Sequence, residues 1–549
     1  MISEMTRHYV SVNGLRIHYR KAGRGRPVIL FHQSPRSSAE YEDLIQEWSR
    51  EFLLIAPDTP GCGYSDPLPL EDPDMMDFAK VMADFVRALD LGKVGLYGFH
   101  TGASLACCVA GLLPERIAMA VAHGLAKFRP DERADLLARY LPPFRPQWDG
   151  GHLAWLWARF REQATFFPWY RRENETRLRM SMYDADKMAA QVNDFLLSGD
   201  EYRKAYAAAF SFNPDAVLGD MKAPIKILGA PPDPLFIHLD RLEGYSDCCE
   251  LIAYESPQQA REGTFELLKQ AEYGDPTPKT ALAEGPESSG KGFVYSGGVR
   301  LHYRKSGEDR RQPPVVLLHD LTENTAAREE IVNALGKTRT VIALDLPGHG
   351  GSAPLPTDDR RPVETCADLL LGAISSLTGE AVELLTYGIS AMIGHRMRCC
   401  SERILKHTAL GFLVPAADML EDFGKSFLPD LSRNPWGGHL MSAWYCVRNR
   451  HLFWPWYQQQ AENIIPITSD FQASKLHNFF VALWQVEEKT AQCLFEDILN
   501  RLRTDGVPAF EGENMAWLPG WAKDSKLVHL PDGQVKFYGA GSEPLIPEA

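Results

Sequence analysis

The stretch GLYGFHTGAS, residues 95–104, decides how this sequence is interpreted. A strand-like run meets Gly98 and Gly102, which are spaced as the two glycines are in the pattern Gly-x-Ser-x-Gly. That pattern makes a sharp turn from a strand into a helix and places a nucleophilic serine at its centre. Here the central residue is His100. The stretch therefore predicts a strand, a tight turn and a helix, with a histidine where a serine is expected.

Much of the sequence on either side of this stretch occurs twice. Five blocks return in the same order at a nearly constant spacing of about 287 residues, which indicates a tandem duplication. The paired blocks are GLRIHYRKAG (14–23) and GVRLHYRKSG (298–307), PVILFH (27–32) and PVVLLH (314–319), IAPDTPGCGYSD (55–66) and IALDLPGHGGSA (342–353), LYGF (96–99) and TYGI (386–389), and GGHLAWLWARFREQATFFPWY (150–170) and GGHLMSAWYCVRNRHLFWPWY (437–457).

The boundary between the two copies is predicted in YGDPTPKTALAEGPESSGKG, residues 273–292. This stretch is rich in Pro, Gly, Ser and charged residues, a composition typical of linkers. The alternative is a strap that packs across the two units. We expect a first domain over residues 1–272, a linker over 273–292 and a second domain over 293–549.

Within each copy, short apolar runs alternate with helical patterns. Strands that alternate with helices predict an α/β fold with a mostly parallel sheet covered by helices on both faces. A long tryptophan-rich stretch without strand signals, residues 141–212, is expected to form a helical cap inserted over the first sheet. The corresponding cap of the second copy is expected at about residues 428–490.

Composition narrows the class of protein. The chain has 549 residues, of which 45% are hydrophobic and 24% charged, as in ordinary soluble globular proteins. The net charge is −14 and no Lys/Arg-rich block occurs, which argues against nucleic acid and membrane partners. The start lacks an apolar signal segment, and the ten cysteines form no Cys-x-x-Cys pair. We expect a cytoplasmic location and no metal site.

Several motifs in fixed order carry a family resemblance. His32 closes a strand, the DTPGCGYS segment (58–65) follows the next strand, and then come the turn at His100, the cap and a late strand with an acid. Both halves of the chain resemble the α/β-hydrolase fold in this order. The resemblance implies backbone N–H donors for an oxyanion at Gln33 and Thr101, and an acidic partner at Asp233.

In the second half the resemblance implies oxyanion donors at Asp320 and Ala391 and a nucleophile at Ser390. That half departs from the family pattern, because Met392 replaces the second glycine of the turn. The position of the family's acid falls on Asn514 or Met515, neither of which is acidic. The late histidine, His529, comes before the Leu-Pro pair in HLPDGQVKFYG, whereas the family pattern places it after such a pair. A serine without base or acid is a poor nucleophile at neutral pH, so the second unit is expected to be degenerate.

The first half lacks both the serine and the late histidine, since no histidine occurs in LIAYESPQQAREG (251–263). An imidazole on the turn reaches further than a hydroxymethyl group and fills part of the missing histidine's volume. We therefore expect His100 to pair with Asp233 as a general base, with the amides of Gln33 and Thr101 stabilising negative charge. Such a cofactor-free site suits ester, lactone or C–C bond hydrolysis, or lyase chemistry.

Further residues are candidates for the site. His32 is considered for a direct chemical role, with structural hydrogen bonding as the alternative, and His123 is placed at the pocket floor. Ser34 and Arg36 lie on the loop expected to form the oxyanion site. His152 and Trp155 in the cap are expected to contact a small apolar or aromatic carbonyl compound. Two cap arginines, at positions 159 and 161, are expected to be solvated or ion-paired.

Two alternatives stay open. The protein could be an inactive ligand-binding or scaffolding protein that keeps the fold, or Ser390 could borrow a base across the interface between the units. The preferred hypothesis is an active first unit in an internal pseudo-dimer, with further homo-oligomerisation possible. The two classes differ in whether His100 and Asp233 meet beside an open pocket.

Overall fold

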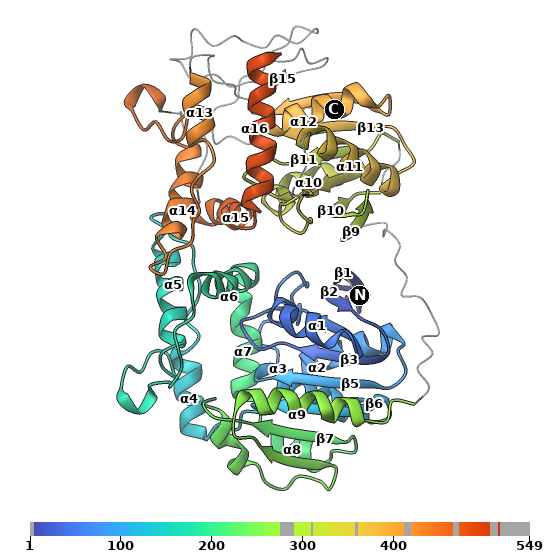
Figure 1. Cartoon of the computed structure of the whole chain (residues 1–549), viewed down its shortest axis with the longest axis vertical. Coiled ribbons are helices and arrows are strands. Elements are labelled where there is room, and N and C mark those ends of the chain that lie inside the picture. The colour runs from blue at the N-terminus through green and yellow to red at the C-terminus, as the bar shows by residue number, and fades with distance from the viewer. Residues whose placement is uncertain are drawn as a thin grey trace. The chain divides into compact units, whose positions relative to one another are not determined.

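A computed structural model describes residues 5–274, 290–308, 311–356, 361–410, 419–464 and 472–505, and the backbone of 514–515 (Figure 1). The chain divides into two compact units, Met1–Arg145 with Trp155–Glu284, and Pro146–Ala154 with Gly285–Ala549. Residues 146–154, inside the predicted first cap, thus group with the second unit. Most of the predicted linker, residues 275–289, lies outside the described residues. The predicted domain boundaries stay a prediction.

The first unit contains an eight-stranded mixed sheet. The strands, in spatial order, are β1 (Thr6–Val12), β2 (Leu15–Ala22), β4 (Phe52–Pro57), β3 (Arg26–Phe31), β5 (Val94–Phe99), β6 (Ile117–His123), β7 (Ile225–Gly229) and β8 (Cys249–Ala253). β2 pairs antiparallel with β1 and β4, and the other pairings are parallel. The apolar runs form the strands, and the helices between them are the crossover connections that join neighbouring parallel strands.

Helices cover both faces of this sheet, and the alternation of side chains along β3 shows why. Ile29 and Phe31 belong to the core beneath α2 (Met75–Leu89) and α3 (Thr101–Leu112). Val28 and Leu30 point to the opposite face, where α1 (Glu42–Trp48) and α9 (Pro257–Gln270) pack. Successive residues of a strand face opposite sides of the sheet, so a fully apolar strand fits a sheet that helices cover on both faces.

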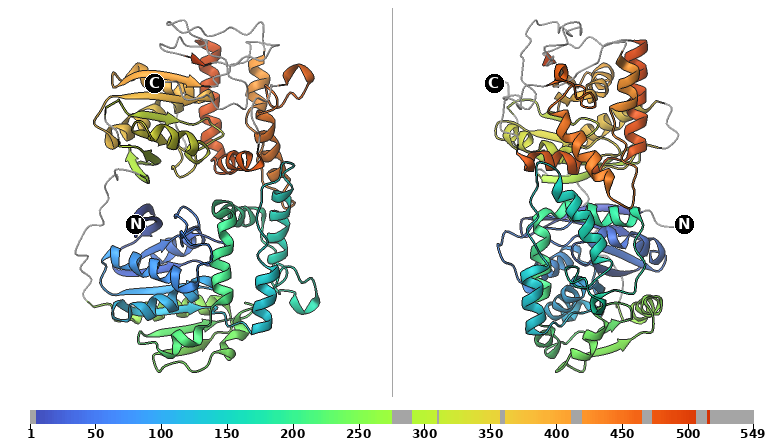
Figure 2. Two further views of the ribbon diagram at one scale, coloured as in Figure 1. Left: turned by 180° about the vertical axis from the view of Figure 1, so that it is seen from behind. Right: turned by 90° about the vertical axis from the view of Figure 1, so that its left-hand side faces the viewer.

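The chain between β6 and β7 forms a helical insertion. Its α-helices are α4 (Pro130–Arg139), α5 (Gly151–Gln163), α6 (Ala185–Ser198), α7 (Tyr202–Ser211) and α8 (Pro214–Gly219). The helices α6 and α7 stand beside the sheet instead of flanking it with α1 and α9 (Figures 1 and 2). This insertion occupies the part of the sequence where the cap was expected.

The second unit has a seven-stranded mixed sheet of the same kind. In spatial order its strands are β15 (Asn514–Met515), β14 (Ile404–Leu410), β13 (Val382–Tyr387), β11 (Val315–Leu318), β12 (Val341–Leu344), β10 (Val299–Ser306) and β9 (Gly290–Ser296). Its α-helices are α10 (Glu329–Gly336), α11 (Pro362–Leu377), α12 (Ala391–Cys400), α13 (Leu420–Ser426), α14 (Gly438–Arg450), α15 (Ala473–Trp484) and α16 (Glu488–Thr504). The predicted α/β fold class is confirmed: each unit has a mixed sheet flanked by helices.

The repeated sequence blocks build the same buried, hydrogen-bonded His–Asp pair in each unit. His18 Nδ1 lies 2.8 Å from Asp58 Oδ2 in the first unit, and His302 Nδ1 lies 2.8 Å from Asp345 Oδ2 in the second. All four side chains are buried. Despite burial, the histidine partner holds the pKa of Asp58 far below its usual value, so this carboxylate stays charged inside the protein.

None of the helices in the described part of the chain combines the length and the apolar composition that a membrane span requires.

Candidate active site

The stretch that opened the sequence analysis forms the predicted strand, turn and helix. β5 ends at Phe99, α3 begins at Thr101, and His100 between them has a φ of +49°. Few residues other than glycine adopt a positive φ. A Cβ on Gly98 would lie 1.9 Å from the carbonyl oxygen of Gly102, and one on Gly102 1.9 Å from that of Phe31. Both glycines are therefore required by close backbone contacts at the turn.

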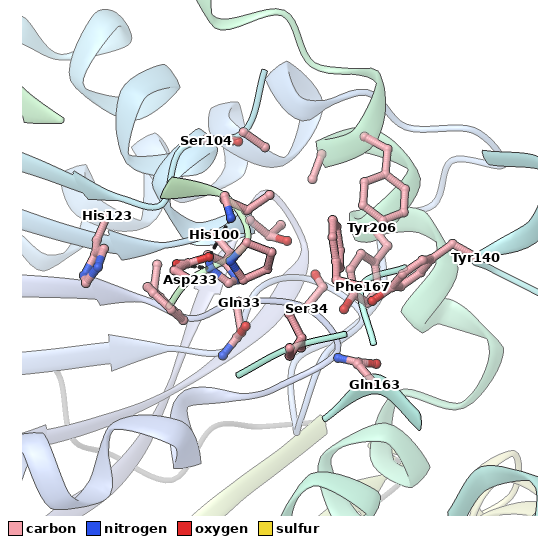
Figure 3. A pocket seen from close by; sticks show the side chains of 18 of the residues that line it. Gln33, Ser34, His100, Ser104, His123, Tyr140, Gln163, Phe167, Tyr206 and Asp233 are labelled. Carbon is pink, nitrogen blue, oxygen red and sulfur yellow. Dashed lines mark hydrogen bonds and ion pairs between the residues drawn. The ribbon is translucent and has the colours of Figure 1, made fainter. Parts of the chain in front are cut away.

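This turn brings His100 into contact with Asp233, which follows β7. His100 Nε2 lies 2.8 Å from Asp233 Oδ2, and Figure 3 shows the two side chains pointing toward one another. The other carboxylate oxygen, Oδ1, accepts a hydrogen bond of 2.8 Å from the backbone N–H of Leu235. The imidazole also stacks on the ring of Phe99, with centroids 3.9 Å apart. Asp233 and the ring of Phe99 thus fix the position of His100, and His100 and the N–H of Leu235 fix that of the Asp233 carboxylate.

The surroundings favour a charged pair. The His100 side chain is 25% exposed and that of Asp233 12% exposed. Burial lowers the pKa of His100, but the Asp233 carboxylate outweighs it, and with a contribution from Glu40 the pKa is raised above its ordinary value. For Asp233, burial raises the pKa, and the contact with His100 outweighs this and lowers it. The histidine therefore holds a proton more strongly than a free imidazole does.

The pair forms part of the wall of a cavity of about 330 Å³ at the carboxyl ends of β5, β6 and β7. Its polar lining side chains are Gln33, Ser34, His100, Thr101, Ser104, His123, Tyr140, Gln163, Tyr183, Tyr206 and Asp233. Its apolar lining includes Phe99, Ala126, Phe128, Phe167, Leu178, Met180, Ala209 and Phe210. A volume of this size holds a small organic molecule, and the lining is mainly apolar and aromatic.

Two tyrosines of this lining were missed by the sequence analysis. Tyr140 follows α4 and Tyr206 lies on α7, and their rings pack 5.5 Å apart. In Figure 3 they lie across the cavity from His100 and Asp233. Burial raises the pKa of Tyr140 well above its ordinary value and also raises that of Tyr206. Both phenols are protonated at neutral pH and can donate a hydrogen bond. No local sequence pattern marks either residue.

One of the two expected oxyanion donors is occupied. The backbone N–H of Gln33 donates to Glu40 Oε2 at 3.2 Å, and the Gln33 side-chain amide donates to the other oxygen of the same carboxylate. The prediction that Gln33 offers its amide to a substrate is therefore not supported by this geometry. Thr101 lines the cavity at the first position of α3, where backbone N–H groups are left without helical acceptors.

His32 lies behind the site and is engaged by backbone groups. Its Nε2 accepts a hydrogen bond of 2.9 Å from the N–H of Thr59, and its Nδ1 lies 2.8 Å from the carbonyl oxygen of Gln33. In the second unit, His319 makes the same two contacts, to the N–H of Leu346 and to the carbonyl of Asp320. Since both ring nitrogens of His32 are engaged in contacts with backbone groups, the expected direct chemical role of His32 is not supported.

The remaining candidates of the first unit divide into two groups. His123 and Ser34 line the cavity, and burial lowers the pKa of His123 to about 4, so its ring is neutral at neutral pH. Arg36 does not line this cavity and binds the carboxylate of Asp194 on α6 at 2.8 Å. Arg36 therefore holds the helical insertion against the loop after β3.

The structure does not bring His152 or Trp155 to this cavity. His152 belongs to residues 146–154, which group with the second unit. Trp155 packs against the rings of Phe144 and Trp169. Both residues are therefore removed from the candidate site. Phe167, from the same stretch of sequence, lines the cavity.

The second unit does not repeat the turn. At the position aligned with His100, Ser390 has an ordinary helical φ of −63°, and the positive φ falls on Gly388 instead. The Ser390 hydroxyl is buried and donates to the carbonyl oxygen of Tyr387 at 2.8 Å. The N–H of Ala391 bonds to the carbonyls of the preceding turn, so it is not a free oxyanion donor.

Asp320 places a carboxylate at the turn of the second unit. Its Oδ1 accepts hydrogen bonds from the N–H groups of Leu321 at 2.8 Å and Ile389 at 3.1 Å, and Arg450 lies 3.6 Å from its Oδ2. A negative charge here is unfavourable for stabilising an oxyanion. Asn514 and Met515 form the short strand β15, and His529 lies outside the described residues.

Among the residues that the structure describes, no group of three His, Cys, Asp or Glu side chains is arranged to hold a metal ion.

Comparison with known proteins adds partial matches. Residues 26–236 match the family model described as alpha/beta hydrolase fold. A stretch of 106 residues is 37% identical to the soluble epoxide hydrolase of Corynebacterium sp. (strain C12), which is 19% of this chain and 37% of that protein. A stretch of 60 residues is 40% identical to cis-3-alkyl-4-alkyloxetan-2-one decarboxylase of Shewanella oneidensis, which is 11% of this chain and 19% of that protein.

A third relative, (E)-2-((N-methylformamido)methylene)succinate hydrolase of Acinetobacter baylyi, is 29% identical over 116 residues, 21% of this chain and 44% of that protein. The chain thus spans less than half the length of each of these relatives. Among solved structures, epoxide hydrolase CorEH without ligand aligns at 20% identity with a TM-score of 0.36, over 48% of this chain and 98% of that chain.

Proposed function

We propose that the first unit is a hydrolase or lyase of small apolar or aromatic carbonyl compounds, in which His100 acts as general base in place of a serine nucleophile. The 2.8 Å contact between His100 and Asp233 at the wall of a 330 Å³ cavity carries this proposal. A base needs an oriented ring and access to a reacting proton: the contact with Asp233 supports the first requirement, and the place of His100 in the cavity wall supports the second.

The proposed chemistry follows from the ring nitrogens of His100. Hydrogen bonding to Asp233 retains the proton on Nε2, so that Nδ1 carries the lone pair that accepts a proton. That proton comes from water, or from a hydroxyl or carbon acid of the substrate. The carboxylate then stabilises the imidazolium that forms. No covalent acyl-enzyme and no cofactor are needed.

Negative charge that develops on the substrate oxygen requires donors. The N–H of Thr101 is the group we assign to this role, and Gln33 is left out because Glu40 occupies it.

The substrate class rests on the lining of the cavity and on the relatives. An apolar and aromatic wall suits an apolar or aromatic body. The relatives are named for an epoxide, an oxetan-2-one and a succinate derivative, of which the last two contain carbonyl groups. The second unit is proposed as a non-catalytic partner. The cytoplasmic location and the pseudo-dimer stay predictions.

A substrate screen tests the proposal. The full chain and its His100→Ala variant are compared on aryl esters, β-lactones, β-diketones and epoxides. Loss of a general base is expected to lower turnover by about 10²- to 10⁴-fold on any compound that the wild type converts. Conversion by both proteins at the same rate would contradict the proposal. A lack of conversion together with tight binding of a ligand would favour the alternative, an inactive ligand-binding protein.

A further inference from the structure

The helical insertion of the first unit encloses a buried arginine. Arg159, on α5, is 1% exposed, whereas the sequence analysis expected it to be solvated or ion-paired. Its guanidinium carbon lies 5.5–5.7 Å from the centroids of five aromatic rings. These rings belong to Tyr140, Phe160, Trp169, Phe195 and Tyr202. Aromatic faces attract a cation but carry no net negative charge.

No carboxylate of the described residues pairs with Arg159. Its Nη1 donates a hydrogen bond of 3.0 Å to Gln163 Oε1, and its Nε and Nη2 have no hydrogen-bond partner in the described part of the chain. Arginine is almost never fully buried without an ionic partner, because removing an unpaired charge from water is unfavourable. An anion is therefore missing from the surroundings of this side chain.

The cavity lies one side chain away from Arg159. Gln163, which accepts the guanidinium hydrogen bond, lines the cavity, and so does Tyr140, whose ring packs on the guanidinium. In Figure 3 both side chains lie across the cavity from His100 and Asp233. Gln163 Oε1 accepts from Arg159, and the Gln163 amide also bonds to the Tyr206 phenol, so one amide N–H is left to donate to a ligand.

We propose that this end of the cavity binds the carboxylate of the substrate, so that the substrate is a small aromatic or apolar acid. The inference rests on the proposed function, which places the reacting carbonyl at the opposite end, beside His100. The amide of Gln163 and the phenol of Tyr206 donate to the carboxylate, and the Tyr140 phenol donates to Tyr206. Arg159 supplies the compensating positive charge from behind Gln163. A ligand of this class removes the charge imbalance that the protein alone leaves.

The test measures binding and needs no turnover. Isothermal titration compares 3-phenylpropionate with its neutral amide, 3-phenylpropionamide, on the full chain. We expect the acid to bind about tenfold more tightly than the amide, the size of one charge-assisted hydrogen bond. This preference disappears in Arg159→Met, which keeps an unbranched apolar chain, and persists in part in Arg159→Lys.

Two further variants make the outcome decisive. Arg172→Met removes an exposed arginine that pairs with Glu162 at 3.1 Å, and it is expected to keep the tenfold preference. Gln163→Leu leaves Arg159 in place and removes the donor between it and the ligand, so the preference is expected to fall. If Arg159→Met does not fold, Gln163→Leu decides the question.

Equal binding of acid and amide to the wild type, binding of neither, or a preference that survives both Arg159→Met and Gln163→Leu would overturn the inference. Failure of the proposed function is separate: His100→Ala is expected to keep the preference for the acid. A wild type that binds the acid through Arg159 but converts no compound would therefore leave the inference standing and overturn only the catalytic role of His100.

Discussion

His100 combines an unusual backbone with an unusual partner. Its positive φ of +49° is sterically unfavourable for an L-residue, and the close packing of Gly98 and Gly102 compensates by fixing the turn. The side chain meets Asp233 at 2.8 Å and holds its proton more strongly than a free imidazole does. A base with a raised pKa is stronger, but it is available only at a pH high enough to deprotonate it.

The pH dependence of turnover follows from this shift. Because His100 must be neutral to accept a proton, we expect the acidic limb of the kcat/KM profile to lie above pH 6.5. In Asp233→Asn the charge that raises the pKa of His100 is gone while its burial persists, so the limb moves to lower pH and the rate falls. Steady-state kinetics from pH 5 to 9 measure both effects. The exposed Asp240→Asn serves as control, and an equal displacement there would contradict the assignment.

At the scale of elements, the site lies where three parallel strands end together. Phe99 ends β5 before His100, His123 ends β6, and Asp233 follows β7. Asp58, which pairs with His18 on β2, accepts hydrogen bonds from the N–H groups of Ser38 after β3 and Tyr64 after β4 and so links these two loops. Gly124, directly after β6, has a φ of +67° and leaves the space in which His100 and Asp233 meet.

Replacement of Gly124 by alanine tests this packing. A Cβ there would lie 2.6 Å from His100 Cδ2 and 3.1 Å from Asp233 Oδ2, so we expect Gly124→Ala to separate the pair and abolish turnover. Gly92 has a similar φ of +73° but open space around its Cβ position. Gly92→Ala therefore loses about 1 kcal/mol of stability for the backbone alone and keeps its turnover. Thermal denaturation and kinetics of both variants measure the difference; equal turnover would refute the packing argument.

At the scale of the whole molecule, the two units share the order of seven strands and differ at the turn that follows β5 in the first and β13 in the second. The two sheets share their strand order and their buried His–Asp pairs. In the first unit His100 lines a cavity. In the second unit the buried Ser390 hydroxyl donates to the carbonyl of Tyr387, and the Asp320 carboxylate accepts from a backbone N–H of the turn. Chemistry is therefore expected from the first unit alone.

Paired variants assign the active unit. We expect Ser390→Ala to retain full turnover of any compound found in the screen, because its hydroxyl only bonds to a backbone carbonyl. His100→Ala is expected to lose that turnover. Kinetic constants of both variants in the full chain provide the comparison. Loss of turnover in Ser390→Ala with intact folding, shown by an unchanged melting temperature, would assign the reaction to the second unit.

The sequence by itself determined the fold class and the strand, turn and helix around His100. Gly98, Gly102 and the alternating apolar runs are local signals, because the turn and the strands that they predict form from residues adjacent in the sequence. It also indicated the pairing of His100 with Asp233, 133 residues apart, through the resemblance to a family pattern. His100 and Asp233 become neighbours because each follows a strand of one parallel sheet, and the ends of those strands lie close together.

Only the tertiary structure decided which polar groups are free. Whether the Gln33 amide is available depends on Glu40, and whether His32 can react depends on Thr59. Whether Arg159 has an ionic partner depends on the side chains that surround it, which are five aromatic rings. Each of these is a contact made by side-chain packing, which no spacing along the chain encodes. The physical reason is that a turn or a strand follows from adjacent residues, whereas hydrogen-bond satisfaction and charge balance belong to the assembled interior.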